Sequence, residues 1–314
     1  MKWMIFKSGF DRKLSFFLVL ALFAAIPKGV SAEKPLAGTL TTLDPRAVGL
    51  GGTLRASASG TSAVYLNPAC IGMVPLYHIG LMYQYTGQEG MHQGGISIVD
   101  AVTTVVAAGL AFNYSGINQT HMRHDSFDGR LALGGGIGDV LYLGATARYL
   151  HLTQNESSSG YGPAGRAALP SSGSIQANGL TFDVGAAVRL GQIFTLGLVG
   201  YNLTNTGSIY APIELGFGAS AHILEMLLIE ANGIVDFTSH GDPAWEVRLG
   251  GELFLMQRLA IRAGYGYDVF FNIHSVSAGA GYVDRQFAID FGFMHEIVEE
   301  GRMILSFGFK YFVN

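Results

Sequence analysis

The chain of 314 residues has little of several features that are common in soluble proteins. It holds one cysteine, Cys70, so neither an intrachain disulfide nor a thiolate metal cluster can form. Charged residues make up 13% of the chain, about half of the quarter that is usual for a soluble domain. Beyond residue 32, no apolar run reaches the roughly 18 residues that a membrane-spanning helix needs. These shortages argue against a disulfide-stapled protein, a zinc-thiolate protein and a helical membrane protein.

Motifs for catalysis and cofactor binding are also lacking. The pair His295-Glu296 is not followed by the second histidine that a zinc protease requires. The glycine clusters at 49–52 and 134–136 are not followed by the Lys-Ser/Thr pair of a phosphate-binding loop. No Ser, His and Asp set stands out as a catalytic triad. The sequence therefore predicts no enzyme, no cofactor and no metal site.

The first 32 residues have the pattern of a secretory signal peptide. Basic residues precede an apolar run over 14–26, and Val30-Ser31-Ala32 supplies the small residues of a cleavage site. A retained N-terminal anchor is the alternative. Cleavage would remove five basic residues and one acidic residue, leaving 14 Lys and Arg against 22 Asp and Glu, a formal charge of −8. That balance argues against nucleic acid as a partner.

Glycine is abundant, with 44 residues, and apolar side chains recur with a period of two. From Met303 to Tyr311 every second residue is apolar, and the residues between them are small or polar. Side chains alternate between the two faces of a strand, so this pattern indicates a strand with one apolar face. We expect fourteen such strands, at 76–86, 91–99, 103–114, 127–137, 140–153, 178–190, 193–204, 212–222, 226–237, 244–255, 258–267, 273–283, 286–295 and 302–312.

The expected connections also alternate in length. Those after odd-numbered strands are longer, such as 115–126 and 154–177, whereas those after even-numbered strands are mostly tight. Outer-membrane barrels have short periplasmic turns and longer outer loops. We therefore predict an all-β fold, a 14-stranded antiparallel transmembrane β-barrel in the outer membrane of a Gram-negative cell, with both termini periplasmic. A soluble sandwich or barrel is the alternative.

Charges fall on the face opposite the apolar one, which predicts a charged lumen. The expected lumen-facing charges are Arg130, Arg148, Asp183, Arg189, Glu214, Glu230, Asp236, Glu246, Arg248, Glu252, Arg262, Asp290 and Lys310. Six positive and seven negative charges nearly cancel, which suits paired networks that hold a plug or brace the wall better than an ion-selective pore. Gly94 and Gly95 predict a bulge or kink, where a lateral opening could lie.

Residues 33–75 do not follow the strand pattern and carry two motifs. The first contains Gly49, Gly51 and Gly52, and the second is Tyr65-Leu66-Asn67-Pro68-Ala69. In these motifs the chain resembles the FadL/TodX-type outer-membrane transport family and its PorV/PorQ-like relatives. The resemblance implies that residues 33–75 form a small hatch, or plug, inside a barrel of residues 76–314. A turn that only packs the plug needs the same chemistry at Asn67-Pro68-Ala69.

The resemblance implies passive uptake of hydrophobic small molecules, of the long-chain fatty acid or hydrocarbon type, past the hatch. Its expected partners are outer-membrane lipid and a hydrophobic ligand. The alternative function is a PorV-like envelope scaffold or secretion-associated barrel that docks envelope protein partners. The polar segment 154–177, rich in Ser, Gly and Pro, mildly favours partner contact or simple disorder.

Overall fold

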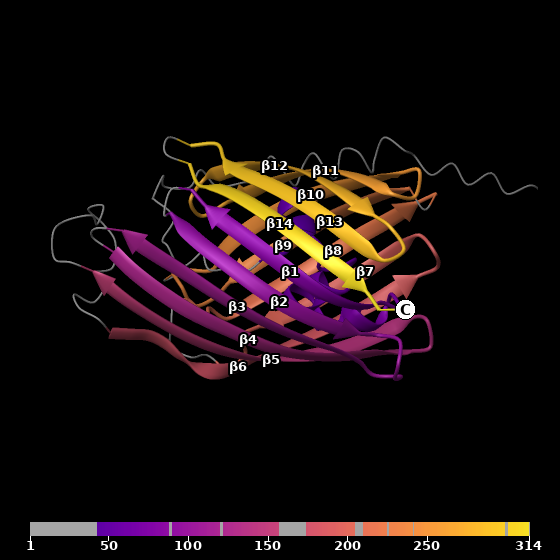
Figure 1. Ribbon diagram of the computed structural model, residues 1–314, viewed down its shortest axis with the longest axis horizontal. Coiled ribbons are helices and arrows are strands. Elements are labelled where there is room, and N and C mark those ends of the chain that lie inside the picture. The colour runs from indigo at the N-terminus through magenta and orange to yellow at the C-terminus, as the bar shows by residue number, and fades with distance from the viewer. Residues whose placement is uncertain are drawn as a thin grey trace, which may run out of the picture.

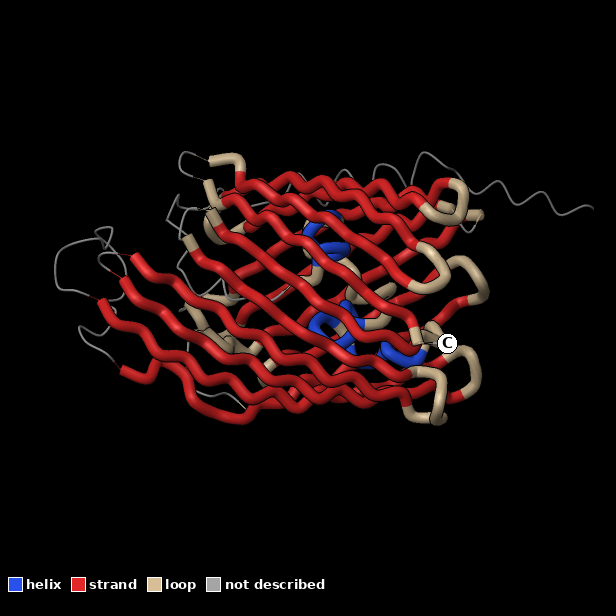
Figure 2. The backbone as a smooth tube through the Cα atoms, in the orientation of Figure 1, coloured by secondary structure: helices blue, strands red, loops and turns tan. Residues whose placement is uncertain are grey.

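The computed structural model describes residues 43–313 except 88–89, 120–121, 157–173, 205–209, 225, 241 and 299–300. The expected signal peptide and the start of the expected hatch segment lie outside the described residues. The described residues form a closed barrel of 14 antiparallel strands with three short helices inside it (Figures 1 and 2). None of the described helices is long and apolar enough to cross a membrane. The predicted fold class is confirmed.

Each strand pairs with its neighbours in sequence, and β1 closes the barrel against β14. The strands are β1 Tyr77–Thr86, β2 Met91–Asp100, β3 Ala107–Gln119, β4 Met122–Ile137, β5 Leu141–Glu156, β6 Ser174–Leu190, β7 Phe194–Tyr201, β8 Glu214–Ile223, β9 Leu227–Asp236, β10 Ala244–Leu255, β11 Leu259–Asp268, β12 Ile273–Val283, β13 Phe287–Glu296 and β14 Met303–Phe312. The helices are α2 Pro45–Gly49, α3 Thr61–Leu66 and the 3-10 helix η2 Pro68–Gly72.

The two faces of the wall differ as the period-two pattern predicts. On β14, Phe307, Phe309 and Tyr311 are 41–50% exposed, whereas Ser306 is fully buried. The same alternation on β10 leaves Trp245 exposed and turns Glu252 inward. Burying apolar surface is the main driving force of packing in water, so an apolar outer face of this size requires an apolar surrounding. The inner face carries most of the polar and charged side chains, together with apolar ones such as Val99 and Ala132.

The strands agree with the sequence-based spans to within a few residues, apart from β3 to β6. The expected loop over 115–126 is wrong, because the β3–β4 ladder continues from Asn113 and Asp128 to Gln119 and Met122. The sequence of residues 115–126 is mostly polar, so the apolar alternation that marks a strand stops there. As a result, β3 to β6 extend beyond the other strands at the end opposite the C-terminus (Figure 1).

The expected bulge at Gly94 and Gly95 is not present. Both glycines pair in continuous register with β1 on one side and with β3 on the other. A register shift occurs instead between Leu152 and Thr153, where β5 pairs with β6. The wall is therefore closed by regular pairing at the place where the sequence suggested a lateral opening.

Candidate functional site

The lumen contains a plug, which we define as residues 43–73. Figure 2 shows its three helices inside the wall, and nearly all of its residues are buried. Helix α2 lies against β12 and β13, whereas η2 lies against β4, β5 and β6. The plug therefore contacts two separate parts of the wall.

The first motif forms α2 and the turn after it. The Asp44 side chain caps the helix, because Oδ1 accepts a hydrogen bond of 3.0 Å from the Ala47 N–H. Gly51 and Gly52 follow with φ angles of 70° and 75°, a backbone conformation that favours glycine. Gly49 has another role, because a Cβ there would lie 2.9 Å from the Cα of Gly279 in the wall.

The second motif ends α3 and begins η2. Asn67 has an extended backbone, and its Oδ1 accepts a hydrogen bond of 3.1 Å from the Ala69 N–H. Its Nδ2 donates to the Arg55 carbonyl oxygen at 2.7 Å and to the Ala186 carbonyl oxygen in β6 at 3.4 Å. Pro68 fits the first position of η2, where no N–H is needed. Asn67 thus joins two segments of the plug to the wall.

Glycines in the wall let the plug backbone approach closely. A Cβ on Gly144 of β5 would clash with the backbone of Pro68, and one on Gly197 of β7 would clash with the Arg55 carbonyl group. The same holds on the opposite side, at Gly264 of β11 against the backbone of Leu50. The high glycine content of the chain therefore serves, in part, to seat the plug.

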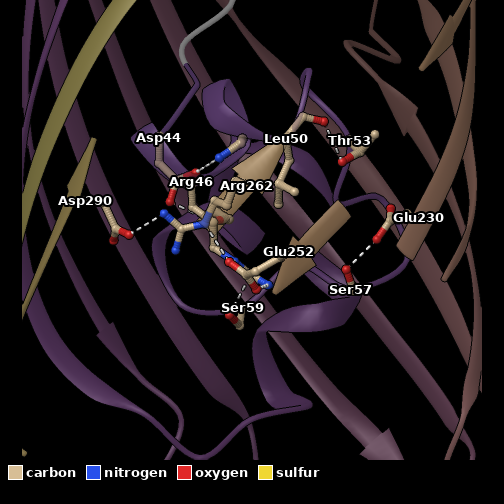
Figure 3. Close-up of polar contacts among 12 residues, drawn as sticks. Asp44, Arg46, Leu50, Thr53, Ser57, Ser59, Glu230, Glu252, Arg262 and Asp290 are labelled. Carbon is tan, nitrogen blue, oxygen red and sulfur yellow. Dashed lines mark hydrogen bonds and ion pairs between the residues drawn. The ribbon is translucent and has the colours of Figure 1, made fainter. Parts of the chain in front are cut away.

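Arg46 of the plug forms ion pairs with the wall (Figure 3). Its Nη2 and Nε lie 2.8 Å and 3.0 Å from the Oε1 and Oε2 atoms of Glu252 on β10. Glu252 Oε2 also accepts from Arg262 Nε of β11 at 2.6 Å. Arg262 Nη1 in turn lies 2.8 Å from Asp290 Oδ1 of β13. Two buried guanidinium groups therefore share one carboxylate.

The chain of charges continues through Lys310 of β14. Its Nζ lies 3.5 Å from Asp290 Oδ2 and 3.4 Å from Asp44 Oδ2. Asp44 Oδ2 also accepts a hydrogen bond of 2.6 Å from the Ser62 hydroxyl. The network then holds three cations, Arg46 and two from the wall, and three anions, which balance. Buried ion pairs require such balance because an unpaired charge in the interior is strongly unfavourable.

A second network lies near η2 and α3. Asp128 of β4 accepts hydrogen bonds of 3.0 Å from Arg130 Nε and from Arg148 Nε. The Arg130 guanidinium lies over the Tyr65 ring, 5.0 Å from its centroid, within reach of a cation–π interaction. Arg148 Nη1 donates to Asn202 Oδ1 at 3.0 Å. Sequence analysis does not single out Asp128. Asp128 lies two residues before Arg130 on the same strand, so both side chains point to the same face.

Further contacts link the middle of the plug to β9. Glu230 accepts a hydrogen bond of 2.9 Å from the Ala56 N–H and a short one from the Ser57 hydroxyl (Figure 3). Arg55 Nη1 donates to the Gly52 carbonyl oxygen at 2.7 Å, which holds the plug turn together. Apart from Tyr65, sequence analysis does not single out the plug residues of these networks, because nothing in residues 43–60 shows which wall residue lies opposite.

Four more of the expected lumen charges lie as follows. Arg248 Nη2 pairs with Glu246 Oε2 at 2.5 Å on β10, and its Nη1 donates to the carbonyl oxygens of residues 51 and 52 at 3.4 Å. Arg189 Nη2 donates to the Met73 carbonyl oxygen at 3.3 Å. The Asp183 carboxylate on β6 accepts from the Asn202 N–H at 2.8 Å. Most of these charges therefore contact the plug or each other.

Burial sets the ionisation of the plug side chains. It raises the pKa of the Cys70 thiol and of the Tyr65 hydroxyl above their ordinary values. Burial alone would lower the pKa of Arg46, but the carboxylates of Glu252, Asp44 and Asp290 together more than offset this, and the pKa of Arg46 is raised. Within the described ranges, no three His, Cys, Asp or Glu side chains form a group that could hold a metal ion.

The geometry defines a class of protein, an antiparallel barrel closed on itself with a polar, plug-filled lumen. No protein-family model matches this sequence, and no curated protein matches it. Among solved structures, the chain is similar to the CymD monoaromatic hydrocarbon channel, with 14% identity and a TM-score of 0.69 over 88% of this chain and 98% of that chain.

Two further structures are similar along nearly their whole length. They are the Ralstonia pickettii toluene transporter TbuX (13% identity, TM-score 0.66, 88% of this chain and 100% of that chain) and a Pseudomonas aeruginosa FadL homologue (14% identity, TM-score 0.60, 86% of this chain and 98% of that chain). The chain therefore has the fold of the FadL/TodX-type channels.

Proposed function

We propose that this protein is an outer-membrane barrel that passes hydrophobic small molecules passively past its plug, and that it is not an enzyme. The observation that carries the proposal is the plug itself, bound to the wall by ion pairs and seated on wall glycines. The fold supports it, because similar structures include a hydrocarbon channel and a toluene transporter.

The charges in the lumen also support passage of hydrophobic rather than charged solutes. The network around Arg46 balances three cations with three anions, so it offers no ring of one sign that would select ions. A plug held in this way blocks free diffusion of polar solutes. A hydrophobic solute gains from leaving water, which supplies a passive driving force toward the membrane.

The proposed placement follows from the wall and its connections. The apolar outer face suits lipid, and only helices or closed barrels satisfy the backbone within a bilayer. The tight turns after even-numbered strands would then be periplasmic, together with both termini. Residues 1–32 would be the signal peptide that directs export. The alternative of a scaffold that docks envelope proteins has no described feature that favours it.

The test is uptake by intact cells, because hydrophobic solutes cross simple phospholipid vesicles without a channel. Labelled toluene and a labelled long-chain fatty acid are offered at limiting concentration to cells with the gene deleted and to complemented cells. We expect faster uptake with the protein and equal entry of a polar sugar in both strains. Equal hydrophobe uptake in the two strains would refute the proposal.

A disulfide lock tests whether the plug has to move. The Thr61 and Ser97 hydroxyl oxygens lie 2.9 Å apart, one on the plug and one on β2, so a cysteine pair there is close enough for an S–S bond of about 2.0 Å. In the background Cys70→Ala, we expect oxidation of Thr61→Cys/Ser97→Cys to stop uptake and a reductant to restore it. The two single variants are the controls. Uptake that survives oxidation would show that the solute bypasses this part of the plug.

A further inference from the structure

The outer face of the barrel carries the same tyrosine–histidine arrangement twice. The Tyr83 hydroxyl lies 2.7 Å from His92 Nδ1, and the Tyr265 hydroxyl lies 2.6 Å from His274 Nδ1. A second ring packs on each imidazole: Tyr85 at a centroid distance of 5.0 Å, and its counterpart Tyr267 at 4.6 Å. We call each set of two tyrosines and one histidine a clamp.

The two clamps also share their register. Tyr85 of β1 is paired with His92 of β2, and Tyr267 of β11 is paired with His274 of β12. In each clamp the other tyrosine lies two residues earlier on the first strand, on the same face. Both histidines are exposed. Two hairpins on separate parts of the wall thus share one register, with Tyr-x-Tyr on one strand and His on the next, although the second ring is tilted by 46° in the first clamp and stacked at 20° in the other.

Both clamps lie where the apolar wall ends. Toward the tight-turn end, the outward side chains on the same strands are apolar, and Leu81 and Ile261 are 54% and 55% exposed. Toward the other end, the strands give way to the connections 87–90 and 269–272. In a membrane barrel this is the level of the lipid headgroups, where aromatic rings with a polar tip are favoured.

The chemistry of the ring identifies the group that fits it. When the tyrosine hydroxyl donates to Nδ1, the proton of the neutral imidazole is on Nε2, and a protonated ring also carries an N–H there. In the described part of the chain, neither His92 nor His274 has a further hydrogen-bond partner. With the tyrosine hydroxyl as the donor to Nδ1, each clamp presents one N–H donor at Nε2 beside an apolar wall, which suits an acceptor that carries acyl chains.

We propose that each clamp binds the phosphate of one membrane lipid, with Nε2–H of His92 or His274 donating to a phosphate oxygen and the acyl chains lying on the wall. The tyrosine hydroxyls are positioning groups that fix the tautomer. This inference rests on the proposed membrane placement and is independent of transport. A metal ion does not suit the clamp, because a single histidine and neutral tyrosines make a poor ligand set.

The test counts lipids that stay bound to the purified protein. The full mature chain is inserted into nanodiscs of phosphatidylglycerol or of digalactosyldiacylglycerol, a bilayer-forming lipid without phosphate, and is released for native mass spectrometry. We expect up to two retained phosphatidylglycerol molecules and no comparable retention of the galactolipid. His92→Phe and His274→Phe keep an aromatic ring without the donor, so each should weaken retention of one lipid roughly tenfold, as for loss of a hydrogen bond to a charged group.

His151 of β5 provides a matched control. It lies on the outer face, but its Nδ1 lies 3.4 Å from an amide oxygen, Asn178 Oδ1, so Nδ1 carries the proton and a neutral ring has no donor at Nε2. His151→Phe should therefore leave lipid retention unchanged. Three outcomes would overturn the proposal. Lipid retention could be unchanged in the double variant His92→Phe/His274→Phe, it could be equal for the galactolipid, or His151→Phe could lower it equally. Failure of the wild-type chain to enter nanodiscs would overturn the membrane placement, whereas loss of uptake in cells leaves the clamps untouched.

Discussion

Replacing Glu252 by glutamine removes the charge that joins Arg46 of the plug to Arg262 of the wall. The carboxylate accepts from Arg46 at 2.8 Å and 3.0 Å and from Arg262 at 2.6 Å. Removing one partner of a buried ion pair costs about 3–5 kcal/mol. Glutamine keeps one acceptor oxygen, and the side chains of Arg46 and Glu252 are 15% and 13% exposed, so we expect a cost of about 2–3 kcal/mol. This corresponds to a roughly 30- to 150-fold higher population of released α2.

The assay is the labelling rate of a cysteine placed in α2. Val48 is fully buried, and Val48→Cys in the background Cys70→Ala replaces its two methyl groups by one sulfur atom, so the side chain stays small and apolar. Labelling by a maleimide then follows the population of the opened state when reclosing is fast. We expect Glu252→Gln to raise this rate by the factor above, while the barrel keeps its heat-modifiable gel mobility.

The matched control is another carboxylate-to-amide change in an ion pair away from the plug. Asp284 lies 3.9 Å from Arg258 in the β12–β13 turn region, and their side chains are 32% and 60% exposed. Exposed pairs contribute little, so Asp284→Asn should leave the labelling rate unchanged. If Glu252→Gln labels no faster than this control, the ion pairs do not hold the plug.

Two further predictions concern the plug and its seat. In the wild-type chain, burial raises the pKa of the Cys70 thiol and shields it from reagents. At about pH 8, a maleimide should therefore label Cys70 only after denaturation. Fast labelling of the folded protein would contradict this prediction. Gly197→Ala places a Cβ against the Arg55 carbonyl group and should destabilise the seated plug by about 1–3 kcal/mol, measured by the same labelling rate in the Val48→Cys background. Gly94→Ala, where a Cβ meets nothing within 4 Å, should have no effect; equal rates in the two alanine variants would refute the clash.

The barrel can be predicted from the sequence because its signal is local and repeated. Every second residue from Met303 to Tyr311 faces one way, and that rule applies to each strand without knowledge of its partner. The continuation of β3 and β4 cannot be predicted in this way, because the sequence of residues 115–126 is mostly polar and shows no apolar alternation. There the ladder is sustained by backbone pairing and by contacts such as that between the Ser115 and Ser126 hydroxyls, 2.5 Å apart.

The candidate site is predictable only in part. The alternation gives the inward face of Glu252, Arg262 and Asp290, but not the identity of their partners. Arg46 and Glu252 are separated by 206 positions in the chain, and no periodicity relates such distant residues. The same limit applies to the wall glycines, because a close approach depends on the backbone that lies opposite.

Among the described residues, the ion pairs between plug and wall involve α2 and its cap, and this asymmetry predicts which part of the plug is released first. Around α3 and η2, apolar wall side chains such as Val99, Ala111 and Ala132 join the buried apolar cluster of the plug. Around α2, the contacts with β10 to β14 include the ion pairs of Arg46 and Asp44. Apolar packing has no switchable element, whereas an ion pair weakens when its charge is removed or rearranged. Release should therefore begin at α2, with η2 as the fixed end, and Glu252→Gln should expose a cysteine at position 48 long before it exposes Cys70.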